Sequence, residues 1–147
     1  MANILVVDDD PVLVDLMATI VTKAGHRVVT AYSGMEALRK LGLEPEDPEA
    51  ALPDLVILDI MMPHSDGYTV GTVIRTRERT RDIPILVVSV LERTSPLFNA
   101  AVHVEGFLNK PFSPDELLAN IAKILANAKT VKPETTGTVS RANRNRN

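Results

Sequence analysis

Carboxylates follow two of the most apolar segments of this 147-residue sequence. Asp8 and Asp9 come directly after the aliphatic run at residues 4–7, and Asp59 follows a second run at residues 55–58. If these runs are neighbouring parallel strands, the three carboxylates meet at the edge of the sheet where open α/β folds bind ligands. Like charges that close together either hold a proton or bind a cation. Magnesium suits such oxygen ligands and leaves room for phosphate oxygens.

Two further residues with useful chemistry lie at the ends of other apolar runs. Ser89 follows residues 85–88 and offers a hydroxyl group, which can donate a hydrogen bond. Lys110 comes shortly after residues 106–108 and supplies a mobile positive charge. With a metal ion to screen an incoming phosphoryl group, Asp59 can act as a nucleophile and form an acyl phosphate. The set therefore indicates phosphoryl transfer to an aspartate.

Short apolar runs alternate with longer helical patterns along the chain, and these elements must position the reactive residues. The expected strands lie at residues 4–7, 28–29, 55–58, 85–88 and 106–108. The expected helices lie at residues 11–24, 34–41, 69–79, 95–103 and 114–128. Strands that alternate with helices indicate a parallel sheet covered on both faces. We therefore expect an α/β fold with a doubly wound, five-stranded parallel sheet and five helices, as in flavodoxin-like proteins.

The expected helix starts carry clear capping signals. Pro11 has no N–H group to leave unpaired in a first turn, so Asp10 before it is expected to cap the helix and not to bind metal. Ser33 is placed to cap the second helix. Ser113 and Glu116 have the spacing of a capping box at the start of the last helix.

Other polar segments have ordinary structural interpretations. The pair Asp66-Gly67 is typical of a turn before a helix. The arginines at positions 75, 77, 79 and 81 are expected to form a solvated helix end, because charge runs are usually solvated. The acidic, proline-containing segment at residues 43–53 indicates a surface loop.

Four segments together resemble the bacterial response-regulator receiver family, and in particular its stand-alone, chemotaxis-regulator-like members. They are residues 4–10, 58–67, 85–89 and 107–112, which occur in order and at expected strand ends. The resemblance covers about the first 128 residues. It implies the strand order 2-1-3-4-5 in the sheet.

The resemblance also implies roles for the acidic residues. Asp59 is then the phosphoacceptor, while Asp8 and Asp9 hold Mg²⁺ together with Asp59 and the backbone carbonyl of Met61. A histidine kinase or a histidine phosphotransfer protein is the implied phosphoryl donor. The protein is then no enzyme in the ordinary sense but a phosphoacceptor that promotes its own phosphoryl transfer and a slow autodephosphorylation.

Three other residues match the signalling apparatus of this family. Lys110 resembles the lysine that contacts the phosphoryl group, and Ser89 and Phe107 resemble the switch pair that repositions afterwards. The implied output is a face around the fourth helix, fifth strand and fifth helix, which binds an unknown downstream protein. A monomer or a phosphorylation-dependent dimer fits this mode of action.

The residues around the expected site depart from the family pattern in size and in their apolar character. The residue after Ser89 is usually small in receivers, whereas here it is Val90. Leu91 and Met61 are both apolar and border the site, so neither can orient an attacking water. These residues predict an acyl phosphate that survives unusually long.

Other function classes fit less well. A haloacid-dehalogenase-type phosphatase needs a second aspartate two positions after the nucleophile, and that position is Met61. A flavodoxin-like redox protein is disfavoured because the sequence has only two tyrosines and three phenylalanines to stack a flavin. A receiver-like binding module that is never phosphorylated stays open as the alternative, although it would not need so many uncompensated carboxylates.

Composition sets the remaining expectations. The sequence has no cysteine, which excludes disulfides and thiolate metal sites. It shows neither a signal peptide nor a long apolar run, so a cytoplasmic location is expected. The net charge of −3 makes nucleic acid an improbable partner. We expect a receiver domain at residues 1–128 and a disordered basic tail at residues 129–147, which contains five basic residues and one glutamate.

Overall fold

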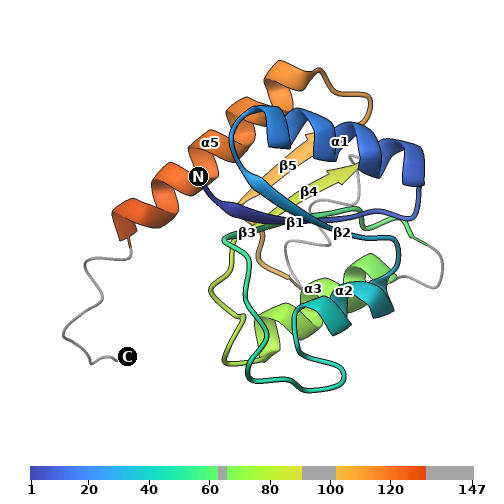
Figure 1. The fold of residues 1–147 in the computed structure, drawn as a ribbon, viewed down its shortest axis with the longest axis vertical. Coiled ribbons are helices and arrows are strands. Elements are labelled where there is room, and N and C mark those ends of the chain that lie inside the picture. Colours follow the sequence, from blue (N-terminus) through green and yellow to red (C-terminus); the bar gives the residue numbers. More distant parts are fainter. Residues whose placement is uncertain (63–65, 91–101, 132–147) are drawn as a thin grey trace.

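The computed structural model describes residues 1–62, 66–90 and 102–131 (Figure 1). The strands are β1 (Asn3–Val7), β2 (Arg27–Ala31), β3 (Leu55–Leu58), β4 (Ile85–Ser89) and β5 (Gly106–Asn109). The described helices are α1 (Pro11–Lys23), α2 (Gly34–Lys40), α3 (Asp66–Thr76) and α5 (Pro114–Val131). All five expected strands are present, with ends that differ from the expectation by no more than two residues.

The five strands form one parallel sheet in the order β2-β1-β3-β4-β5, as the family resemblance implied. Helices α1 and α5 cover one face of the sheet, and α2 and α3 cover the other (Figure 1). Each face has its own apolar core. Strands β1, β3 and β4 are buried on both sides, which explains their unbroken aliphatic sequences.

The predicted helix caps are confirmed. Asp10 caps α1, since its Oδ1 accepts hydrogen bonds from the N–H groups of Val12 and Leu13 at 3.0 and 3.4 Å. Ser113 and Glu116 form the expected reciprocal pair at the start of α5. The Glu116 carboxylate accepts from the Ser113 N–H at 2.8 Å, and the Ser113 Oγ accepts from the Glu116 N–H at 3.1 Å. These bonds satisfy amide groups that a helix start leaves unpaired.

Helix α3 starts earlier than the sequence suggested, and the interpretation of Asp66-Gly67 as a preceding turn was wrong. Both residues belong to the first turn of α3. A Cβ atom on Gly67 would lie 2.3 Å from the Cα of Ile60 and 2.4 Å from the carbonyl oxygen of Asp59. Glycine is therefore required here because the helix packs directly on the backbone that follows β3, not because a turn needs its conformational freedom.

The expectation of a solvated helix end was wrong for Arg77 and Arg79, which bind a neighbouring loop. The Arg77 guanidinium donates to the Leu43 carbonyl at 3.2 Å and to the Glu44 carboxylate at 2.8 Å. Arg79 donates to the carbonyl of Ala50 at 3.0 Å. The acidic loop at residues 43–53 is thus attached to the end of α3, a contact that the local charge pattern does not reveal.

Two expectations concern segments at the limits of the described chain. The helix expected at residues 95–103 falls mainly within 91–101, outside the described residues, and residues 102–105 are not helical. Helix α5 continues to Val131, three residues beyond the expected domain end, and the rest of the expected tail is not described. Among the described helices, none has the length and apolar character that a membrane span requires.

The packing of Gly67 predicts a large cost for adding one methyl group there. Gly67→Ala is expected to lower the free energy of unfolding by about 3 kcal/mol, the upper end of typical overpacking costs, because backbone atoms cannot rotate away. Thr69→Ala, at an exposed position of the same helix, is the matched control and should change it little. Urea denaturation of both variants measures the difference. Equal stability of the two variants would contradict the close contact.

Candidate functional site

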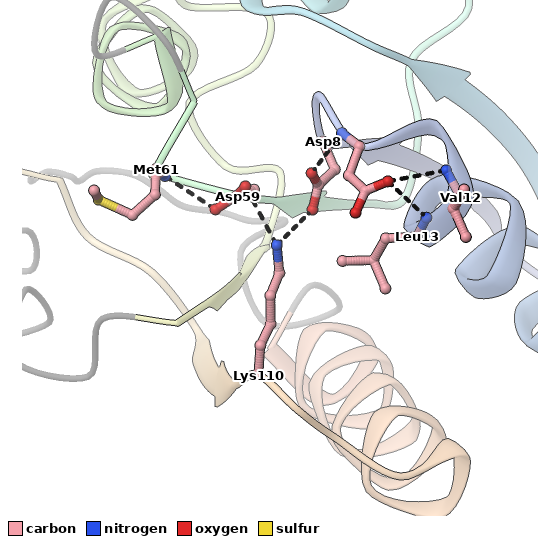
Figure 2. A network of polar contacts seen from close by, with 7 residues as sticks. Asp8, Val12, Leu13, Asp59, Met61 and Lys110 are labelled. Carbon is pink, nitrogen blue, oxygen red and sulfur yellow. Dashed lines mark hydrogen bonds and ion pairs between the residues drawn. The ribbon is translucent and has the colours of Figure 1, made fainter.

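The two acidic strand ends lie side by side at the carboxyl edge of the sheet (Figure 2). Val7 pairs with Leu58 in the parallel register of β1 and β3, so Asp8 and Asp59 come next on adjacent strands. Both are almost fully buried, with 1% and 4% of their surface exposed. Backbone bonds hold them there, because the Asp8 N–H donates to Ala31 on β2 and the Asp59 N–H donates to Val7.

Asp9 joins these two residues to form a cluster of three carboxylates. One carboxylate oxygen from each of Asp8, Asp9 and Asp59 lies within 4.8 Å of the other two. Carboxylate oxygens this close together can be shared by one Mg²⁺ ion, which takes one or two carboxylates and completes its shell with waters. The donor set therefore fits a hard divalent cation.

The ammonium group of Lys110 balances part of this negative charge. Its Nζ lies 2.9 Å from Oδ2 of Asp8 and 3.4 Å from Oδ2 of Asp59 (Figure 2). Lys110 follows β5 directly, and its backbone N–H donates to the carbonyl of Ser89 at 3.0 Å. Three strands thus contribute charged groups to one small volume.

The site raises the pKa of both Asp59 and Lys110. Burial raises the pKa of Asp59, and the negative charge of Asp8 adds to that effect. The N–H of Met61, which donates to Asp59 Oδ1 at 2.9 Å, and the charge of Lys110 oppose the shift without cancelling it. Burial alone would lower the pKa of Lys110, but the hydrogen bond to Asp8 and the charge of Asp59 outweigh it, so that pKa stands above its ordinary value.

Asp10 and Met61 lie at the margin of the cluster. The Oδ1 of Asp8 accepts a hydrogen bond from the Asp10 N–H at 3.0 Å, while the Asp10 carboxylate is turned toward the first turn of α1. The Met61 side chain is 47% exposed and extends away from Lys110 (Figure 2). What Met61 contributes to the contacts at Asp59 is its backbone N–H.

Ser89 and Phe107 lie on the same face of the sheet. Phe107 pairs with Val87, and the side chain of Ser89, two residues after Val87, points to that face as well. The Oγ of Ser89 is buried and has no hydrogen-bond partner within the described part of the chain. Phe107 is half-buried against the core beneath α2 and α3. A buried hydroxyl without a partner is costly, so Ser89 has a free hydrogen-bonding group close to the site.

Apolar side chains surround this edge of the sheet. A pocket of about 300 Å³ beside Lys110 is lined by Leu13, Leu16, Val90, Pro111 and Phe112. Val90 is 58% exposed. Other exposed large apolar residues at the same edge are Val12, Tyr32, Met35, Met61 and Tyr68. The charged cluster therefore sits within an apolar rim, which favours a protein as the group that approaches it.

The structure brings most of the residues chosen from the sequence into one place. Asp8, Asp9, Asp59 and Lys110 meet directly, and Ser89 joins through its backbone. Leu91 lies outside the described residues. The sequence analysis did not identify Gly67 as a residue that shapes the site. Its only signal in the sequence was the dipeptide Asp66-Gly67, which is also common in turns.

Comparison with known proteins identifies the family. Residues 4–122 match the response regulator receiver domain. The chain is 34% identical over 126 residues to the DNA-binding dual master transcriptional regulator RpaA of Synechocystis, which covers 85% of this chain and 49% of that protein. It is 33% identical to the regulatory protein PhoP of Bacillus subtilis, covering 89% and 51%. The chain thus spans about half the length of these curated relatives.

Solved structures agree with this result. The response regulator TrrA of Thermotoga maritima, in complex with Mg²⁺ and BeF, has a TM-score of 0.71 and 33% identity over 84% of this chain and 99% of that one. The chemotaxis protein CheY4 of Vibrio cholerae has a TM-score of 0.74 and 30% identity over 84% and 98%. The chain therefore belongs to the response regulator receiver domain family of two-component signalling.

Proposed function

We propose that Asp59 accepts a phosphoryl group from a histidine kinase or a histidine phosphotransfer protein. The single observation that carries the proposal is the contact of the Lys110 ammonium with Asp8 and Asp59 in the cluster of three carboxylates. A lone acyl phosphate would add charge to a buried, already anionic site. The ammonium and a divalent cation together supply the positive charge that the transferred group needs.

Mg²⁺ is the cation that we propose for the carboxylate cluster. Asp8, Asp9 and Asp59 would hold it, with the backbone carbonyl of Met61 as a further ligand. When bound, it neutralises phosphoryl oxygens during transfer. The chain's own residues do the remaining work: Asp59 attacks phosphorus, Lys110 binds a phosphoryl oxygen, and the bond to the donor histidine breaks.

The free hydroxyl of Ser89 supports a switching role. We propose that it turns to donate a hydrogen bond to the phosphoryl group and that Phe107 repositions with it, since both side chains lie on one face of the sheet. Such a change shifts the population of two conformations of the output face. That face binds a downstream protein in this proposal, and the receiver domain acts in the cytoplasm.

The alternative is a binding module that keeps the fold without being phosphorylated. The buried carboxylate pair and the raised pKa of Asp59 speak against it, because such a module would carry the cost of burying these charges without any benefit. Phosphorylation and metal binding decide between the two functions.

Phosphorylation itself is tested first. With Mg²⁺ and acetyl phosphate as a small donor, the intact mass of the wild type should increase by one phosphoryl group, and Asp59→Asn should gain none. Asp15→Asn, on the exposed face of α1, is the matched control and should be phosphorylated like the wild type. If neither this donor nor a histidine kinase gives an adduct on the wild type, the binding module is the correct interpretation.

The burial of Asp59 predicts a dependence of stability on pH. A raised pKa means that the folded protein holds the proton more tightly than the unfolded chain, so this stabilisation is present at low pH and is lost as pH rises through the folded pKa. In EDTA, Asp59→Asn should therefore exceed the wild type in free energy of unfolding at pH 7 by on the order of 1 kcal/mol, with a smaller gain near pH 4. Urea denaturation measures both values.

Two results are informative in that experiment. Asp15→Asn should show no such dependence, because its carboxylate is exposed. Added Mg²⁺ should stabilise the wild type by about 2.7 kcal/mol at a hundredfold excess over its dissociation constant, and Asp59→Asn much less. An Asn variant that is less stable than the wild type at pH 7 in EDTA would contradict the electrostatic argument.

The size of Val90 predicts a long-lived acyl phosphate. Val90 lines the pocket beside Lys110, so it restricts the approach of water to the phosphoryl group. After removal of the donor, the phosphorylated mass should persist for minutes or longer, and Val90→Ala should shorten its half-life several-fold. Val12→Ala, at another exposed apolar position of the same edge, should leave the half-life unchanged. Return of the wild type to the unphosphorylated mass within seconds would refute the prediction.

A further inference from the structure

The strand that carries Lys110 is weakly held. Among the described residues, β5 lies at the edge of the sheet and pairs with β4 alone, and Leu108 is the only residue of β5 that is buried. Strands with one neighbour and little buried surface open more readily than central strands. The position of Lys110 therefore depends on what fixes β5 at its other end.

An arginine near the end of α3 binds the segment that leads into β5. The Arg75 Nε donates to the carbonyl of His103 at 2.8 Å, and Nη2 donates to Oε1 of Glu105 at 2.9 Å. Its Nη1 donates to the carbonyls of Arg81 and Ile83, at 2.9 and 2.6 Å. The Arg75 side chain is only 14% exposed, so these charge-assisted bonds are largely shielded from water.

Glu105 carries this contact into the sheet. The same Oε1 atom accepts a hydrogen bond from the N–H of Ile85 at 2.7 Å, and the Glu105 N–H donates to the carbonyl of Ile85 at 2.9 Å. One guanidinium–carboxylate pair thus joins the end of α3, the start of β4 and the start of β5. The other carboxylate oxygen of Glu105 lies 3.4 Å from Nε2 of the exposed His103.

We propose that Arg75 is a positioning residue for phosphoryl transfer, which acts through Glu105 and β5 to hold Lys110 at the acceptor site. This inference rests on the proposed function of Asp59. Glu105 and Lys110 flank the four residues of β5, so the strand is anchored by a charged contact at each end. A small displacement of a catalytic group is costly, since about 1 Å can slow a reaction by about a hundredfold.

If Arg75 acts by anchoring β5, its loss should affect the rate of phosphoryl transfer and Mg²⁺ binding differently, which a general loss of stability would not do. The carboxylates that would bind Mg²⁺ come from β1 and β3, which do not contact Arg75 through any of the bonds above. Loss of Arg75 should therefore slow phosphoryl transfer at saturating Mg²⁺ without raising the Mg²⁺ concentration for half-maximal rate. Arg77 offers a matched control. It lies directly after α3, and its side chain binds the loop at Leu43 and Glu44 instead of the segment that leads into β5.

The experiment measures the rate at which the full chain acquires the phosphoryl mass from acetyl phosphate. Arg75→Met should slow it by about five- to tenfold at saturating Mg²⁺, and Arg77→Met by less than about twofold. Arg75→Lys keeps the charge but not the planar fork, so its rate should be intermediate. Lys110→Ala should be slow, and adding Arg75→Met to it should cause no further loss, because Arg75 acts through Lys110.

Several outcomes would overturn the role of Arg75. The first is a double variant whose rate falls below that of Lys110→Ala by the same factor as Arg75→Met lowers the wild-type rate. The second is a rate for Arg77→Met that is as low as that of Arg75→Met. The third is an increased Mg²⁺ requirement in Arg75→Met. Hydrogen exchange without any donor gives a second measure, in which the amides of residues 106–110 should lose protection in Arg75→Met and not in Arg77→Met. A wild type that never gains the adduct refutes the proposed function instead, and equal exchange in both variants refutes the anchoring.

Discussion

The convergence of three carboxylates at the carboxyl ends of β1 and β3 is the constraint on which the rest of the site depends. Asp8 and Asp59 are almost fully buried, and their mutual repulsion must be offset by positive charge. In this structure the Lys110 ammonium provides it from the end of β5, which lies two strands from β3 and three strands from β1 in the sheet. The parallel sheet makes this possible, because it places the ends of distant segments at one edge.

Helix α3 links that edge of the sheet to the opposite one. Its first turn packs on the backbone of Asp59 and Ile60 so closely that only glycine fits at position 67. Its far end holds the start of β5 through Arg75 and Glu105. The strand that ends before Asp59 and the strand that leads to Lys110 are therefore placed by the same helix. This arrangement gives α3 a role in preorganising the site, since charge stabilisation depends on groups that are already in position.

The apolar rim around the charged cluster bears on the kind of partner that reaches Asp59. Val12, Met35 and Val90 are all more than half exposed at this edge, where a small donor would gain nothing from them. A protein surface can bury these side chains and exclude water from the charged cluster. The matched part of this chain covers about half of each curated relative, and the rim lies on the receiver domain within that part.

The sequence by itself predicted the five strands, several helix starts and the residues that meet in the charged cluster. Continuous aliphatic runs marked the strands, Asp10 and the Ser113–Glu116 pair marked helix starts, and the aspartates after two strands marked the site. Tertiary structure decided what Gly67 and Arg75 do, and it left the Ser89 hydroxyl without a partner among residues 1–62, 66–90 and 102–131. The physical reason is range: caps and strand patterns depend on neighbouring residues, whereas Arg75 meets Glu105 thirty positions away, and only the folded packing brings them together.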